Sequence, residues 1–372
     1  IQTGFGPFIS VYLTAQGWTQ TSIGLALSLG TVTAMASQVP AGALVDAAPS
    51  KPAVVLCSVV AFSASALFFA LWPVPLSIYA AEVIHGFSSC TLGPAINAIS
   101  LSVAGSVLLG LRLGRNARFA SIGNGIGAAL MGACGYYVSE RAVFFLTAAL
   151  TLPAVASLHL LRGADGLAAA RGESASRRER LSELISDRRL LIFAACAMLF
   201  TLANAALLPL AGSALTKRAG DAATLLIAAC IVMPQLIVAA VSPTVGRVAQ
   251  SRGRRWVLLL GFGAVPLRAA LLALIPSPLP LVAIQALDGI AASCFGVMVP
   301  LVISDIAGGS GRYNLALGVI GLAIGVGATA STSLAGWISD QFGMSVAFAV
   351  LATVGLAAEL LVWLAMPETQ PE

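Results

Sequence analysis

Apolar runs of about twenty residues follow one another along almost the whole chain, and this feature restricts the fold most strongly. An α-helix needs roughly 20 apolar residues to cross the hydrocarbon core of a bilayer. The runs cover approximately residues 1–15, 20–45, 52–72, 76–104, 114–138, 142–161, 190–214, 222–246, 256–275, 281–305, 313–338 and 343–365. We therefore expect an all-α membrane protein with twelve transmembrane helices.

The composition agrees with lipid as the main solvent of this chain. Of the 372 residues, 58% are hydrophobic and only 9% are charged, whereas a soluble domain carries about 25% charged residues. The six cysteines all fall inside apolar runs and form no Cys-x-x-Cys pair, so they do not predict a metal site or a disulfide framework. We expect no cofactor and no nucleic-acid partner.

One stretch, residues 162–189, is polar and contains seven arginines. It divides the chain into two halves of six runs each, residues 1–161 and 190–372. We predict that these halves are two six-helix bundles joined by a cytoplasmic linker. The chain starts at Ile1, already inside the first run. We interpret this run as a helix that lacks its beginning, and not as a cleavable signal peptide.

The positions of the basic residues predict the orientation. If the first run begins in the cytoplasm, sixteen of the twenty lysines and arginines fall in loops on the cytoplasmic side. The opposite side receives only Arg141, Lys217 and Arg218, and Arg268 lies within a run. Because basic residues accumulate in cytoplasmic loops, we expect an inner-membrane protein with both termini in the cytoplasm.

The two halves also resemble each other at matched positions. The segment from Gly42 to Lys51 follows the second run, and the segment from Gly246 to Arg255 follows the eighth, at an offset of 204 residues. In the fourth and tenth runs, Glu82-x-x-His85-Gly86 corresponds to Gln285-x-x-Asp288-Gly289. A repeat of six plus six helices is typical of parallel-repeat transporters.

With these motifs the whole chain resembles the major facilitator superfamily, whose members carry a Gly-x-x-x-Asp-x-x-Gly-Arg/Lys-Arg/Lys loop after helices two and eight. The first copy here has Pro49 in place of a glycine, and the second has Gln250 at the acidic position. The resemblance implies two six-helix repeats in the family's fold, with Asp46 meeting the cytoplasmic ends of helices four and eleven. The gating-loop residues it implies are Gly42, Asp46, Arg112, Gly246, Arg254 and Arg312.

The resemblance also implies that helices one, four, seven and ten line a central cavity. The substrate-binding residues expected on this basis are Gln2, Phe5, Tyr12, Asn97, Asn204 and Gln285. Uncharged amides beside aromatic rings suit an organic solute better than a bare metal ion. Taken one by one, the amides also fit the alternative that each forms a hydrogen bond between helices.

Four ionisable residues, Glu82, His85, Arg268 and Asp288, lie well inside the runs and are functional candidates, because a charge is expensive to bury in a membrane. A fifth, Glu359, lies near the end of the last run, where its side chain can reach the membrane surface. Glu82 and His85 are three residues apart and share a helix face. We predict Glu82, His85 and Asp288 as proton-coupling residues. Arg268 and Asp288 lie at similar depth on adjacent helices, so we also predict an ion pair between them, which is structural or breaks during transport. The alternative for His85 is a histidine that only packs between helices.

The function predicted from these features is proton-coupled secondary transport of small organic compounds by alternating access. A glycine-rich run from Gly123 to Gly135 is similar to the antiporter signature of drug exporters, although it lacks the Gly-Pro pair. Glycines spaced by four also fit the alternative that they let helices pack closely in lipid, so the run favours efflux by proton antiport only slightly. The alternative is a proton symporter that imports a siderophore-like molecule or a metabolite. A receptor or a membrane-embedded enzyme is the least favoured function. The partners expected are a small-molecule substrate, protons and membrane lipid, and we expect a monomer that is not an enzyme.

Overall fold

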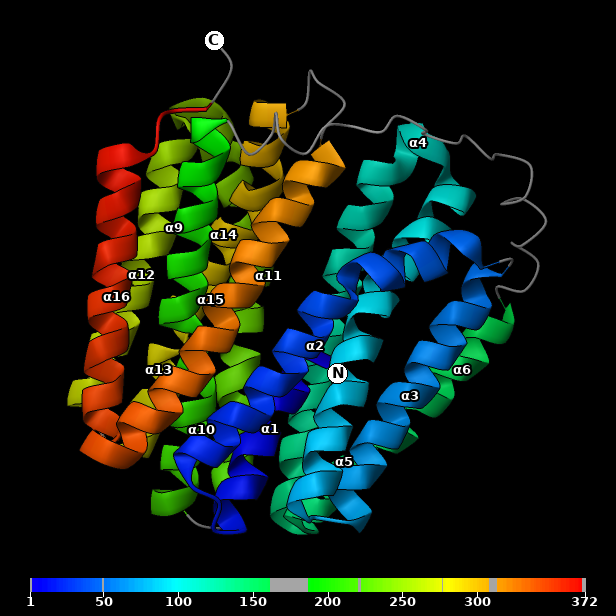
Figure 1. The fold of residues 1–372 in the computed structure, drawn as a ribbon, viewed down its shortest axis with the longest axis vertical. Coiled ribbons are helices and arrows are strands. Elements are labelled where there is room, and N and C mark those ends of the chain that lie inside the picture. The colour runs from blue at the N-terminus through cyan, green and yellow to red at the C-terminus, as the bar shows by residue number, and fades with distance from the viewer. Residues whose placement is uncertain are drawn as a thin grey trace. The chain divides into compact units, whose positions relative to one another are not determined.

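The computed structural model describes residues 2–48, 50–160, 187–219, 222–275, 277–307 and 313–369. Within these ranges the chain is helical between short turns, as Figure 1 shows. The predicted linker, residues 162–189, lies outside the described residues except for its end, where Asp187 caps a helix by accepting a hydrogen bond from the amide of Arg189 at 2.9 Å.

The helices divide into two compact units. Unit 1 comprises residues 1–3 and 29–177, and it contains most of α2 (Gln20–Ala47), followed by α3 (Lys51–Leu71), α4 (Pro75–Tyr137), α5 (Glu140–Ala149) and α6 (Thr151–Leu160). A small apolar core joins α2, α3 and α4 through Val45, Val54, Val55 and Ala95.

Unit 2 comprises residues 4–28 and 178–372. It contains α1 (Gln2–Ala15), the first turns of α2, and eight further helices: α9 (Arg188–Asn204), α10 (Leu207–Ala219), α11 (Ala223–Arg252), α12 (Arg254–Leu274), α13 (Pro278–Ile284), α14 (Ala286–Ala307), α15 (Tyr313–Phe342) and α16 (Met344–Ala365). Helix α2 thus passes from unit 2 into unit 1 between Ser28 and Leu29. The repeat boundaries that the sequence suggests at 161 and 190 stay a prediction.

The chain's local chemistry explains where these helices begin and end. Ser50 caps α3 by accepting a hydrogen bond from the amide of Ala53, and Pro52 occupies the first turn, where a missing N–H costs nothing. Gly253 and Gly343 precede α12 and α16 with φ of 95° and 92°, a backbone conformation that only glycine adopts readily. These glycines allow the chain to reverse direction within one residue.

The lengths and apolar composition of the helices fit a membrane environment. Among the described residues, eight helical segments are long and apolar enough to span a bilayer: Lys51–Leu71, Glu140–Leu158, Arg188–Ala219, Ala223–Ala249, Arg254–Leu274, Leu279–Ile303, Ala316–Phe342 and Met344–Ala365. The runs expected at 76–104 and 114–138 both lie in α4, whose helical backbone continues through the residues between them. No proline interrupts residues 95–137, so no residue there removes a helical hydrogen bond.

Candidate functional site

Unit 2 buries a cationic side chain, Arg268 of α12, with only 1% of its surface exposed. Its Nη1 lies 2.5 Å from Asp288 Oδ1 and donates a 2.8 Å hydrogen bond to Asn204 Oδ1. Its Nη2 donates to Gln285 Oε1 at 2.5 Å. The two residues expected to pair, Arg268 and Asp288, are therefore in contact, and the structure adds Asn204 and Gln285 to them. Whether this pair is structural or breaks during transport stays a prediction.

The three partners of Arg268 come from two interruptions in the helices. Helix α9 ends at Asn204, and α10 begins three residues later at Leu207. Pro209 explains this break, because it has no N–H for the carbonyl of Ala205. Gln285 separates α13 from α14, and Asp288 lies in the first turn of α14. Interrupted helices with polar residues at membrane depth are found where a transporter lines a cavity or binds its substrate.

The hydrogen bonds of this cluster are incomplete. Arg268 Nε and Gln285 Nε2 are buried and have no partner among the described residues. Asp288 also accepts from Asn204 Nδ2 at 3.4 Å through Oδ1, and 19% of its side chain is exposed. The cluster therefore offers two unused buried donors beside an accessible carboxylate, an arrangement that can accept a polar group or a water molecule.

Unit 1 buries an acidic side chain, Glu82 of α4, with 2% of its surface exposed. Glu82 Oε2 lies 3.7 Å from Nδ1 of His85, one turn further along the helix, and Oε1 has no hydrogen-bond partner among the described residues. His85 meets the ring of Phe62 edge-on, with 5.4 Å between ring centroids. The geometry thus brings Glu82 and His85 together, while the coupling role stays a prediction.

Two glycines create the space around Glu82. A Cβ on Gly30 of α2 would overlap the Glu82 carboxylate, and a Cβ on Gly86 would overlap the carbonyl oxygen of Gly30. Because neither residue has a side chain, α2 and α4 approach closely at this point. The buried carboxylate is consequently held between two helices and not at the edge of one.

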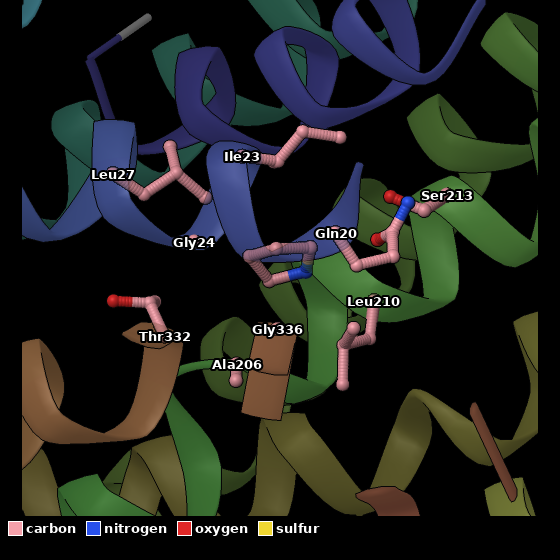
Figure 2. Close-up of a pocket in the computed structure, with 10 residues that line it drawn as sticks. Gln20, Ile23, Gly24, Leu27, Ala206, Leu210, Ser213, Thr332 and Gly336 are labelled. Atoms are coloured by element: carbon pink, nitrogen blue, oxygen red, sulfur yellow. The ribbon is translucent and has the colours of Figure 1, made fainter. Parts of the chain in front are cut away.

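A second close approach, in unit 2, joins the first turns of α2 to α15, and we call it the α2–α15 seam (Gln20–Ser28 against Thr329–Asp340). Here a Cβ on Gly24 would overlap the carbonyl oxygen of Thr332. Ser28 Oγ lies 2.6 Å from Thr332 Oγ1 and 2.7 Å from Ser333 Oγ. Figure 2 shows the cavity beside this seam, between α2, α10 and α15. Its water-accessible volume is about 10 Å³, which suits one water molecule and not an organic substrate.

At the N-terminal end of α12, Arg254 is the centre of a hydrogen-bond network that the sequence did not predict. Arg254 Nε donates to Asp305 Oδ2 at 3.0 Å, and its Nη1 donates to the carbonyl of Ala249 at 2.7 Å. The carboxylate of Glu368 accepts from the backbone amides of Arg254 and Arg255 at 2.8 and 3.2 Å, which caps the first turn of α12. Asp305 and Glu368 were not among the sequence candidates, because they lie 51 and 114 residues from Arg254 in the chain and no local pattern connects them to it.

Several expected residues lie outside what the structure describes. The side chains of Gln2, Phe5, Asn97, Asp46 and Arg112 are not described, and neither is Arg312. The backbone places Gly42 and Asp46 in α2 and Arg112 in α4, so these three positions are helical and do not lie in the loops expected from the sequence. Tyr12 is buried to 1% exposure in α1. Gly246 lies in α11, where a Cβ would meet no described atom within 4 Å. The contact expected between Asp46 and Arg112 or Arg312 therefore stays a prediction.

The sequence profile described as the Major Facilitator Superfamily matches residues 1–252 and 193–372. Two Mycobacterium tuberculosis proteins, from strains CDC 1551 / Oshkosh and ATCC 25618 / H37Rv, are each named an uncharacterized MFS-type transporter. Each is 36% identical to this chain, over 99% of this chain and 90% of the relative.

Solved structures share the fold. The nucleoside transporter NupG superimposes with a TM-score of 0.77 at 16% identity, over 97% of both chains. A bacterial homolog of the human lysosomal transporter Spinster, in an inward-facing and occupied conformation, gives a TM-score of 0.79 at 13% identity, over 98% of this chain and 94% of the homolog. At these identities the likeness concerns the fold alone.

Proposed function

Because the chain belongs to the major facilitator superfamily, and is therefore a multi-pass membrane transporter and not an enzyme, we propose that it couples the movement of a small organic compound to the proton gradient. The proposal places the protein in the inner membrane with both termini in the cytoplasm. The two units would work by alternating access, and proton antiport would drive efflux.

The observation that carries proton coupling is the burial of Glu82. Its side chain is 2% exposed, one carboxylate oxygen has no hydrogen-bond partner in the described part of the chain, and the other lies 3.7 Å from a histidine nitrogen. A buried carboxylate without a permanent counter-charge is costly, whereas the neutral acid is much less so. Glu82 can therefore gain or lose a proton as its surroundings change from dry to wet, and His85 can receive that proton.

Asp288 is less suited to carry the proton, although it shares the ionisable chemistry. Arg268 keeps its positive charge under all physiological conditions, and its side chain is 1% exposed beside Asp288. Protonation of Asp288 would leave this buried cation without its counter-ion, which costs several kcal/mol. We therefore assign Glu82 and His85 to coupling and place Asp288 at the substrate side, where Asn204 and Gln285 surround it.

The direction of transport rests on the glycine-rich part of α4. A Cβ on Gly123 or Gly125 would meet no described atom within 4 Å, so close packing against described neighbours does not explain these two glycines. This supports the antiporter reading of the segment over a packing role. Symport of an imported organic solute is the alternative. NupG, which shares the fold, is a nucleoside transporter, so nucleosides belong in the first substrate panel.

Purified protein in liposomes tests the proposal. An imposed pH gradient should drive radiolabelled substrate from a panel of nucleosides, amphipathic drugs and metabolites against its concentration. Movement opposite to the proton flux supports antiport, and movement with the proton flux identifies the symport alternative. A substrate transport rate that is the same with the pH gradient, without it and after a protonophore has collapsed it would refute proton coupling.

A further inference from the structure

Where α11 meets α12, the two helices diverge from Gly253 and leave a surface groove of about 530 Å³. We call it the α11–α12 groove, and its lining consists of Val248, Arg252, Trp256, Val257 and Leu260. Val248 and Arg252 lie one turn apart on α11, as Trp256 and Leu260 do on α12. The groove thus has an apolar floor and one arginine at its mouth.

The arginine at this mouth is available to a ligand. Arg252 is exposed and forms no hydrogen bond or ion pair with any described residue. Its acidic neighbours are already engaged, because Asp305 pairs with Arg254 and Glu368 caps the first turn of α12. Among the described residues next to the groove, Asp305 and Glu368 are thus bound to α12, and Arg252 is left for a ligand.

The floor of the groove continues onto the apolar outer face of α12. Trp256, Leu260, Leu267 and Leu274 are 68%, 59%, 52% and 77% exposed, and their spacing places them along one side of the helix. Such a face lies against acyl chains in a bilayer, and an exposed tryptophan at a helix end is typical of the headgroup level. Basic pockets between transmembrane helices on the cytoplasmic side recognise anionic headgroups.

We propose that the α11–α12 groove binds an anionic phospholipid of the adjacent leaflet. The phosphate pairs with Arg252, the glycerol region lies against Trp256, and an acyl chain follows Leu260 along α12. A zwitterionic lipid fits the same apolar floor, but its headgroup also carries a positive charge, which the guanidinium of Arg252 repels. The site therefore selects by headgroup charge.

Quenching of Trp256 fluorescence tests this in the purified full chain. Phosphatidylglycerol with brominated acyl chains is titrated against brominated phosphatidylcholine, and the signal of Trp256 is the difference between the parental protein and Trp256→Phe. One arginine near an anionic headgroup should favour phosphatidylglycerol by about fivefold. Arg252→Gln should abolish this preference. Arg247→Gln should retain it, because Arg247 is also exposed on α11 but does not line the groove.

Equal quenching of the Trp256 signal by the two lipids would overturn the proposal, and this comparison requires only the parental protein and the conservative variant Trp256→Phe to fold. Equal loss of preference in Arg252→Gln and Arg247→Gln would also overturn it, since the effect would then be general surface charge. Complete displacement of brominated phosphatidylglycerol by inorganic phosphate would show a site for a free anion, and not for a lipid.

Discussion

Asp340, near the end of α15, caps the first turn of α2 through Thr21, although 319 residues separate them in the sequence. Asp340 Oδ2 accepts hydrogen bonds from the backbone amide of Thr21 at 2.5 Å and from its hydroxyl at 2.6 Å. Asp340 Oδ1 accepts from the amide of Gln20 at 2.9 Å. A carboxylate at a helix N-terminus is stabilising, because the first amides have no partner within the helix.

Asp340→Ala should therefore destabilise the protein by about 1 kcal/mol, the usual value of a lost N-terminal cap. Thr21→Val removes only the hydroxyl and should cost less. Thermal unfolding in detergent measures both, and a double-mutant cycle isolates their interaction. Strictly additive effects of the two substitutions would argue against the contact.

Gly336→Ala should destabilise the α2–α15 seam. The new Cβ would overlap the carbonyl oxygen of Gln20, and a backbone atom cannot move aside as a flexible side chain can, so we expect a loss of about 1–3 kcal/mol. Gly318→Ala is the matched control in the same helix, because a Cβ there meets no described atom within 4 Å. The control should be neutral or up to about 1 kcal/mol more stable. Indistinguishable melting temperatures would contradict the close approach.

Arg268→Ala should reduce the yield of folded protein sharply. Removing the cation leaves the carboxylate of Asp288 without its partner, and breaking a buried ion pair costs about 3–5 kcal/mol. The charge reversal Arg268→Asp with Asp288→Arg should recover part of this loss, because it restores opposite charges. Yield by size-exclusion chromatography and thermal unfolding report the difference, with exposed Arg247→Ala as control. A reversal as harmful as Arg268→Ala would speak against a pair that is only structural.

Glu82→Gln and His85→Ala should abolish transport driven by a pH gradient and leave substrate binding intact. Each substitution removes a group that we propose to carry the coupling proton, while the proposed substrate groups near Asp288 lie in the other unit. Glu359→Gln is the matched control, because Glu359 is a carboxylate inside α16 beside Gly263. Proton-driven flux in liposomes is compared with ligand binding in detergent. Unchanged pH dependence in both variants would remove Glu82 and His85 from the coupling mechanism.

Gly253→Ala should be destabilising for two reasons. The backbone φ of 95° with ψ of 164° is a conformation essentially restricted to glycine, which costs other residues about 1–3 kcal/mol. A Cβ at this position would also overlap the Glu368 carboxylate that caps α12. Gly246→Ala, inside α11 and free of described neighbours within 4 Å, should instead be neutral or stabilising. Equal stability of the two variants would show that the turn at Gly253 between α11 and α12 tolerates a side chain.

Much of the fold follows from local sequence. The runs predicted at 52–72, 256–275 and 343–365 agree with α3, α12 and α16 within two residues at each end. The reason is that a bilayer leaves the backbone no hydrogen-bond partner except the helix itself, so apolar length and turn residues suffice to place a helix. The helical repeat also places Glu82 and His85, three residues apart, on one face of α4 without any tertiary contact.

Contacts between distant helices needed the tertiary structure. Depth along adjacent helices predicted that Arg268 meets Asp288, but the breaks at Asn204 and Gln285 that complete the cluster were not foreseen. Asp340 was missed altogether, because nothing in its neighbourhood reveals that the amides of Gln20 and Thr21 lie beside it. Sequence alone determined most helical segments and the burial of Glu82 and Arg268, since both depend on local hydrophobicity. Only the packing of the helices decided which polar groups meet, because a hydrogen bond depends on distances of a few ångströms that no local pattern encodes.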